Sequence, residues 1–212
     1  MLKFYFKLFL YSLVLLTLST ARADPAVEFF RAVNTDDAGT VKALLDRGFD
    51  PNTLSEKGQV GLYLAFRDES PKVVAALLAH PKTRLDAVNA ADETPLMMAA
   101  LRGQVDGVRQ LLDRGASLNR PGWTPLHYAA SGPGAGGVAL LLERGARLEA
   151  LSPNRTTPLM MAARYGPEAA VDLLLARGAS LQARNDAGLG AVDFALLAGR
   201  EALAQRLQAA TR

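Results

Sequence analysis

The chain has 212 residues, of which 24 are Lys or Arg and 21 are Asp or Glu, and it contains no cysteine. This length fits one domain or two small ones, and the lack of cysteine excludes disulfides, thiolate metal sites, iron–sulfur clusters and a thiol nucleophile. The formal net charge of +3 suggests a nucleic acid or a membrane surface as partner, so the position of the charges matters.

The N-terminal segment has the layout of a secretory signal. Lys3 and Lys7 precede a largely apolar run at residues 8–18, and small residues follow up to Ala23. This order is typical of a signal peptide with cleavage after Ala23, and the run is shorter than the roughly 20 residues that a membrane-spanning helix needs. An uncleaved N-terminal anchor is the alternative. We expect a signal peptide at 1–23, a periplasmic or secreted protein, and no stable membrane insertion after cleavage.

The charge excess belongs to this segment. Lys3, Lys7 and Arg22 lie in it and no acidic residue does, so the rest of the chain has 21 basic and 21 acidic residues. A neutral chain has no overall electrostatic attraction to phosphates. We therefore expect no nucleic-acid partner.

From residue 24 onward the chain repeats one helix pair. A first phrase begins with Thr-Pro-Leu, ends with Ala-Ala, and occurs at residues 94–100, 124–130 and 157–163. Thr followed by Pro is typical of a helix start, because Thr caps the first amides and Pro fits the first helical position. The leucine is expected to face inward, and the alanines let a neighbouring helix approach. Each phrase predicts a short first helix.

A second phrase, Leu-Leu-x-Arg-Gly, predicts the end of a second helix. It occurs at residues 44–48, 111–115, 141–145 and 174–178. Arg suits the negative end of the helix dipole, and Gly adopts the left-handed conformation that often ends a helix. One such pair has too little apolar surface to fold alone, so the pairs must stack on one another.

The first phrase resembles the start of the ankyrin repeat, Thr-Pro-Leu-His-x-Ala. Residues 124–129 match it completely, whereas the copies that start at 94 and 157 have Met in place of His. The resemblance implies an all-α ankyrin-repeat solenoid of stacked helix pairs, with short β-hairpin or turn fingers between them. It implies one ankyrin repeat domain at 24–212, with units at about 25–57, 58–91, 92–121, 122–154, 155–187 and 188–212.

One finger is shorter than the others. The repeat length is 30 to 34 residues, and it is 30 from Leu112 to Leu142. The missing residues lie between Leu118 and Thr124, where the third unit joins the fourth. We therefore predict a notch in the row of fingers beside Trp123.

Several features suggest chemistry, and each has a simpler structural explanation. Residues 132–137 fit the G-x-G-x-x-G pattern, but they follow a predicted helix instead of a strand, so they indicate an inter-helix turn. The resemblance implies a structural hydrogen bond for His127, and His80 stands at a helix end. The two Met-Met pairs suggest packing in preference to copper binding. We predict no enzyme activity, no catalytic residue, no metal and no cofactor.

The resemblance implies protein binding on a concave face made of the fingers and the exposed side of each first helix. The candidate residues stand just before each Thr-Pro start and just after each Ala-Ala pair. Trp, Tyr and Arg often dominate binding energy, which favours Trp123 and Tyr165, although packing against the adjacent finger is the alternative for Trp123. The candidate protein-binding residues are Lys57, Gln59, Arg67, Asp68, Glu93, Leu101, Arg102, Arg120, Trp123, Ser131, Asn154, Thr156, Arg164, Tyr165 and Leu189.

These observations predict an exported, non-catalytic scaffold that binds another protein on its concave face, such as an enzyme that it stabilises or inhibits. We expect it to be a monomer. One alternative is a secreted effector directed at host cells. Another is a small-ligand-binding protein that uses the glycine-rich turn or the notch.

Overall fold

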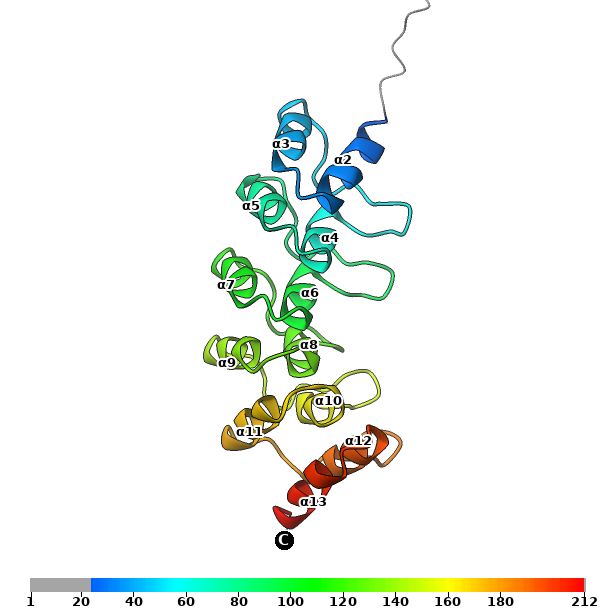
Figure 1. Ribbon diagram of the computed structural model, residues 1–212, viewed down its shortest axis with the longest axis vertical. Helices are drawn as coiled ribbons and strands as arrows, with labels where there is room; N and C mark the ends of the chain where they lie inside the picture. Colours follow the sequence, from blue (N-terminus) through cyan, green and yellow to red (C-terminus); the bar gives the residue numbers. More distant parts are fainter. Residues whose placement is uncertain (1–23, 212) are drawn as a thin grey trace, which may run out of the picture.

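The computed structural model describes residues 24–211, and the predicted signal segment lies outside this range. Within it the chain is all-α, with twelve helices in six consecutive pairs and no strands. Figure 1 shows the pairs stacked along the long axis, as the sequence predicted. The pairs are α2 (Pro25–Asn34) with α3 (Ala38–Asp46), α4 (Gly61–Arg67) with α5 (Pro71–Ala79), α6 (Pro95–Leu101) with α7 (Val105–Asp113), α8 (Pro125–Ser131) with α9 (Gly136–Glu143), α10 (Pro158–Tyr165) with α11 (Glu168–Ala176), and α12 (Ala191–Leu197) with α13 (Glu201–Ala209).

The first helices of the pairs form one row and the second helices form another. In the first row each helix from α4 to α12 packs against the next, and this packing is more extensive than that between the second helices. Figure 1 shows that the first row is curved and that the fingers project from its concave side. The first helices therefore supply both the centre of the core and the concave face.

Threonine side chains cap α6 and α10, as predicted, whereas Thr124 stands at the N-cap of α8 without a side-chain cap hydrogen bond. Thr94 Oγ1 accepts a hydrogen bond from the Met97 amide at 3.2 Å, and Thr157 Oγ1 accepts one from the Met160 amide at 3.3 Å. In both copies the methionine sulfur lies 3.4 Å from the threonine amide nitrogen. A thioether is a weak acceptor, so methionine takes the place of the consensus histidine in the cap.

Glycines end the second helices in the predicted conformation. The φ angle is 90° at Gly48, Gly145 and Gly178 and 91° at Gly115. The amide after each glycine donates to the first leucine carbonyl of the phrase, for example Ala146 N to Leu141 O at 2.9 Å. This pattern is the Schellman motif, and it turns the chain toward the next finger.

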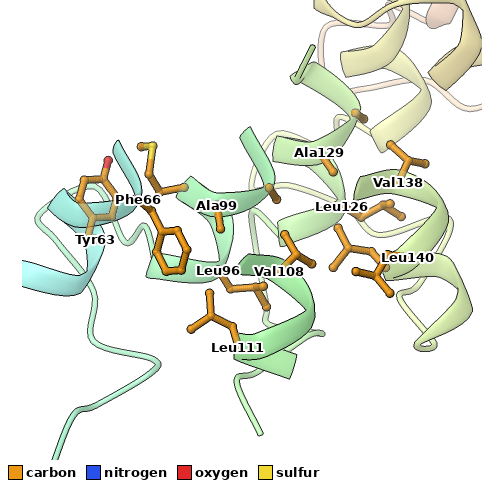
Figure 2. Close-up of a cluster of buried hydrophobic side chains, with 14 of the residues drawn as sticks. Tyr63, Phe66, Leu96, Ala99, Val108, Leu111, Leu126, Ala129, Val138 and Leu140 are labelled. Carbon is orange, nitrogen blue, oxygen red and sulfur yellow. The ribbon is translucent and has the colours of Figure 1, made fainter. Parts of the chain in front are cut away.

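The apolar core is continuous along the whole array. Leu96, Leu126 and Leu159, which follow the Thr-Pro starts, are all buried. Figure 2 shows buried side chains of the second, third and fourth pairs in one cluster, in which Leu96 lies near Leu111 of the same pair and Leu126 near Leu140 of the next. The first helices of these pairs also pack against one another. Each pair thus buries its apolar surface against its neighbours, which is how a repeat array gains stability.

The fingers are turns. The first finger contains a single antiparallel bridge, Leu54 with Val60. Four fingers are closed at the base by a backbone hydrogen bond, from Ser55 N to Gln59 O (2.9 Å), Asn89 N to Glu93 O (3.1 Å), Ser152 N to Thr156 O (3.1 Å) and Asn185 N to Leu189 O (3.0 Å). Figure 1 shows that the connection from α7 to α8 projects less than these four.

A ladder of hydrogen bonds joins the bases of consecutive fingers. In each step a side-chain oxygen of one unit accepts a hydrogen bond from a backbone amide of the next unit. The steps run from Arg84 N to Asn52 (2.7 Å), from Ser117 N to Asp86 (2.9 Å), from Arg147 N to Asn119 (2.9 Å) and from Ser180 N to Glu149 (2.8 Å). The ladder satisfies amides that the fingers leave without a helical or strand partner.

The glycine-rich segment forms the turn between α8 and α9, and its last two glycines, Gly136 and Gly137, are the first residues of α9. A Cβ atom on Gly132 would lie 2.9 Å from the Leu101 carbonyl oxygen and 3.0 Å from that of Ala100. Glycine is therefore needed here for close backbone packing between pairs. Among residues 24–211, no helix combines the length and the apolar character required to cross a lipid bilayer.

Candidate protein-interaction surface

Unit four differs from its neighbours where the first helices face the concave side. Counted from the N-cap threonine, the seventh and eighth residues are Leu101 and Arg102 in the third unit and Arg164 and Tyr165 in the fifth. The fourth unit has Ser131 and Gly132 at these positions. Two small residues therefore stand between two pairs of long side chains.

A cavity of about 370 Å³ opens on the concave face at this point. Two features of the sequence produce it, the small side chain of Ser131 in α8 and the short finger that precedes Trp123, and it lies where a notch was predicted. Its lining is mainly apolar and aromatic and comes from three consecutive units: Leu101, Trp123, His127, Tyr128, Ser131, Met161 and Tyr165.

His127 forms the buried floor of this cavity. Its Nε2 atom lies 2.9 Å from the Thr156 carbonyl oxygen, which can only accept, so Nε2 carries the proton. Its Nδ1 atom accepts the Thr124 amide hydrogen at 3.2 Å. Burial lowers the pKa of His127 to about 4, because the charged imidazolium loses its hydration. The ring is neutral at pH 7, and both nitrogens serve the predicted structural hydrogen bonds.

Trp123 both packs on its neighbour and lines the cavity. Its ring lies 5.2 Å from that of His127, at an interplanar angle of 77°. This edge-to-face contact fixes the indole. The residue is only half-buried, so part of the ring stays open to the concave face.

Glu93 connects three units beside the cavity. Its carboxylate accepts hydrogen bonds from the Tyr63 hydroxyl (2.6 Å), the Asn89 amide (2.7 Å) and the Tyr128 hydroxyl (2.9 Å). Burial on its own raises the pKa of Glu93, but the three hydrogen bonds outweigh burial and lower it below its ordinary value. Burial, together with the Glu93 carboxylate, raises the pKa of both tyrosines. Glu93 was predicted as a partner contact, which stays a prediction; within the array its carboxylate joins three units.

The arginines of this face differ in their partners. Arg67 pairs with Asp68 at 2.7 Å, Arg102 with Glu69 at 2.6 Å and Arg120 with Asp92 at 2.7 Å. Arg164 instead lies over the Tyr165 ring, with its guanidinium carbon 5.1 Å from the ring centre. Within residues 24–211, Arg164 makes no ion pair with a carboxylate.

The other predicted residues lie at varied depths. Lys57, Gln59 and Arg67 line a second hollow of about 400 Å³, between the first finger and α2. Asn154 is exposed on the fourth finger and Leu189 is half-buried on the fifth. Thr156 is only 1% exposed, so its side chain does not reach the concave surface. Its carbonyl lies against His127 Nε2, and its amide donates to Ser152 Oγ.

Sequence reasoning missed three residues of the cavity wall. His127, Tyr128 and Met161 line it, whereas the sequence suggested only packing for the Met-Met pairs and only a structural hydrogen bond for His127. Tyr128 and Met161 are each the fourth residue after their N-cap threonine. That shared position was the signal that could have placed them on the concave side.

Within residues 24–211, no group of three or more His, Asp or Glu side chains is arranged to hold a metal ion. The cavity floor is a neutral imidazole engaged at both nitrogens, and its walls are mainly apolar. This chemistry favours contact with an apolar group over acid–base or metal chemistry.

Comparison with solved structures finds a close likeness in fold. The chain is similar to an immunity protein in the structure described as Bd0816 predatory endopeptidase from Bdellovibrio bacteriovorus in complex with immunity protein Bd3460. The TM-score is 0.72 at 27% sequence identity, and the match covers 86% of this chain and 97% of the other. Comparison with curated proteins finds no significant match.

Comparison with protein-family models finds ankyrin repeats (3 copies) at residues 29–121 and again at 117–185. The two matches together span most of the chain and include all the repeats that carry Thr-Pro starts. The chain belongs to the ankyrin repeat family.

Proposed function

We propose that this protein is an exported, non-catalytic scaffold that binds one partner protein on its concave face. The observation that carries the proposal is the aromatic cavity at the centre of that face, lined by Trp123, Tyr128 and Tyr165. Open pockets with aromatic walls and arginines around them are typical of the centre of protein interfaces.

The likeness to an immunity protein in complex with an endopeptidase supports a more specific proposal for the partner. We propose that the partner is a hydrolase, in the first instance an endopeptidase, and that binding restrains its activity. The layout of residues 1–23 supports export, to the periplasm or outside the cell.

Photocrosslinking in the source cells tests the binding face. A photoreactive amino acid replaces Arg102, which is exposed and follows the cavity residue Leu101 in the chain, or Gln205, which is exposed on α13 in the row of second helices. We expect one defined protein adduct from position 102 and none from position 205. Equal adducts from both positions, or an adduct only from position 205, would exclude the concave face.

Enzyme assay of the crosslinked partner tests the restraint. The partner is purified alone, and its rate of peptide-bond hydrolysis is measured with increasing amounts of the scaffold. We expect a stoichiometric fall in rate, which is weakened by the double substitution Trp123→Ala and Tyr165→Ala. A rate that the scaffold leaves unchanged would refute restraint while leaving the binding role intact.

Cell fractionation tests export. We expect the full chain outside the cytoplasm with Asp24 as its first residue by mass spectrometry, and a variant without residues 1–23 inside the cytoplasm. A full chain that remains cytoplasmic would contradict the proposal.

A further inference from the structure

The cavity and Arg164, whose guanidinium lies over the ring of the lining residue Tyr165, together point to the chemistry of the partner. This inference rests on the proposed function, because it assumes that a protein binds the concave face. We infer that the cavity receives a large apolar side chain from a partner loop, and that an Asp or Glu next to that side chain pairs with Arg164.

The shape of the cavity favours a side chain over a small molecule. Sites for small molecules bury most of the ligand surface. Here Tyr165 forms one wall and is itself 57% exposed, so the wall is low and the cavity is open to the concave face. An open hollow of this kind suits a group that arrives on another protein, whose own surface then covers the opening.

The lining determines the apolar part of the occupant. Leu101, Met161 and the rings of Trp123 and Tyr165 surround the hollow. The floor, His127, uses both ring nitrogens within the array, so it offers no polar contact to an occupant. A polar side chain that lies against this floor would lose hydration without a compensating hydrogen bond from the imidazole.

The charges around the cavity determine the acidic part. Arg102 and Arg120 already pair with Glu69 and Asp92. Arg164 lies against Tyr165 and Phe194, 5.1 and 6.0 Å from the ring centres, without a carboxylate partner within residues 24–211. A carboxylate beside the apolar group complements this charge, and the ring beneath holds the guanidinium in place.

Trp123 provides a direct readout, because it is the only tryptophan of the chain. The purified protein is titrated with four capped peptides, Gly-Phe-Asp-Gly, Gly-Ala-Asp-Gly, Gly-Phe-Asn-Gly and Gly-Phe-Lys-Gly, while tryptophan fluorescence is recorded. We expect saturable binding of Phe-Asp in the millimolar range. Replacing Phe by Ala weakens binding about tenfold or more, and replacing Asp by Asn weakens it about two- to threefold.

Two variants locate the binding. Ser131→Leu fills the hollow with the side chain that unit three already carries at this position, and it abolishes the fluorescence change, whereas Gln205→Leu adds the same side chain on α13 and leaves the change intact. Arg164→Gln removes the preference for Asp over Asn and Lys but keeps that for Phe over Ala. The four-peptide comparison on the wild type stands even if a variant fails to fold.

Three results would overturn the inference. The first is equal binding of the Phe and Ala peptides, or no saturable binding of either. The second is a fluorescence change that depends on protein concentration without peptide, which would identify a second copy of the chain as occupant. The third is a partner adduct from position 102 that forms equally well with Ser131→Leu; the proposed function would then stand without this inference. Loss of that adduct in Ser131→Leu but not in Gln205→Leu supports it.

Discussion

Glu93 is the residue with the widest influence on the array. Its carboxylate accepts hydrogen bonds from side chains of α4, the second finger and α8. Glu93→Ala leaves the Tyr63 and Tyr128 hydroxyls without their acceptor, and we expect it to lower the free energy of unfolding by about 2 kcal/mol. Urea denaturation followed by circular dichroism measures this. Asp113→Ala, which removes an exposed partner of Arg144, is the control and changes stability by less than about 1 kcal/mol.

The same carboxylate gives a pH signature. The pKa of Glu93 in the folded protein lies below its ordinary value of 4.5. The contribution of the ionised carboxylate to the free energy of unfolding is therefore complete above pH 4.5 and is lost as the pH falls through the folded pKa. We expect the stability difference between the wild type and Glu93→Gln to shrink below about pH 4.5. A stability difference that stays constant from pH 7 to pH 3 would contradict the claim that the ionised carboxylate of Glu93 is the hydrogen-bond acceptor.

His127 gives a signature in a higher pH window. Its folded pKa of about 4 lies below the ordinary value of 6.5, so between these values the unfolded chain binds the extra proton and acid destabilises the fold. We expect the stability contribution of the neutral ring to fall by up to about 3 kcal/mol from pH 7 to pH 4. His127→Met copies the residue that units three and five carry here. Thermal melts should show the wild type losing stability relative to His127→Met as the pH falls from 7 to 4.

At the scale of elements, the turn between α8 and α9 tests close packing between units. Gly132→Ala places a Cβ against the carbonyl oxygens of Ala100 and Leu101, and we expect a loss of about 1–3 kcal/mol. Gly134→Ala, two residues along the same turn, meets nothing within 4 Å. We expect it to change stability by about 0.5 kcal/mol or less. Equal effects of the two substitutions in chemical denaturation would refute the close contact.

The helices and their ends could be predicted from the sequence because local rules determine them. Thr94 and Thr157 cap helices through their own neighbours, and Gly145 ends one through a left-handed backbone. The pairing of Glu93 with Tyr63 and Tyr128 could not be predicted, because it joins residues 30 and 35 positions away. The cavity was only partly predictable. The short finger beside Trp123 and the small residue Ser131 were visible in the sequence, but the closing of side chains from three units around one hollow needed the packing of α6, α8 and α10 in space.

At the scale of the whole molecule, the pairs are joined unequally. Stability in repeat arrays is a sum of terms for each unit and for each contact between neighbours, and Glu93 adds one further link across the second, third and fourth pairs. We therefore expect slower amide hydrogen exchange in α4, α6 and α8 than in α10 and α12. Glu93→Ala should remove most of this difference. Uniform exchange along the wild-type array would show that the link adds nothing beyond nearest-neighbour packing.

The position of the cavity relative to that link has a dynamic consequence. Leu101 and Trp123 belong to the units that Glu93 joins, whereas Met161 and Tyr165 belong to the next one. The cavity therefore spans the boundary between the fourth and fifth pairs. Local unfolding that starts at the C-terminal end of the array should stop at this boundary. A group bound in the cavity contacts the pairs on both sides of this boundary. Binding should therefore slow amide hydrogen exchange as far away as α12. Occupancy of the concave face would in this way reduce local unfolding along the array.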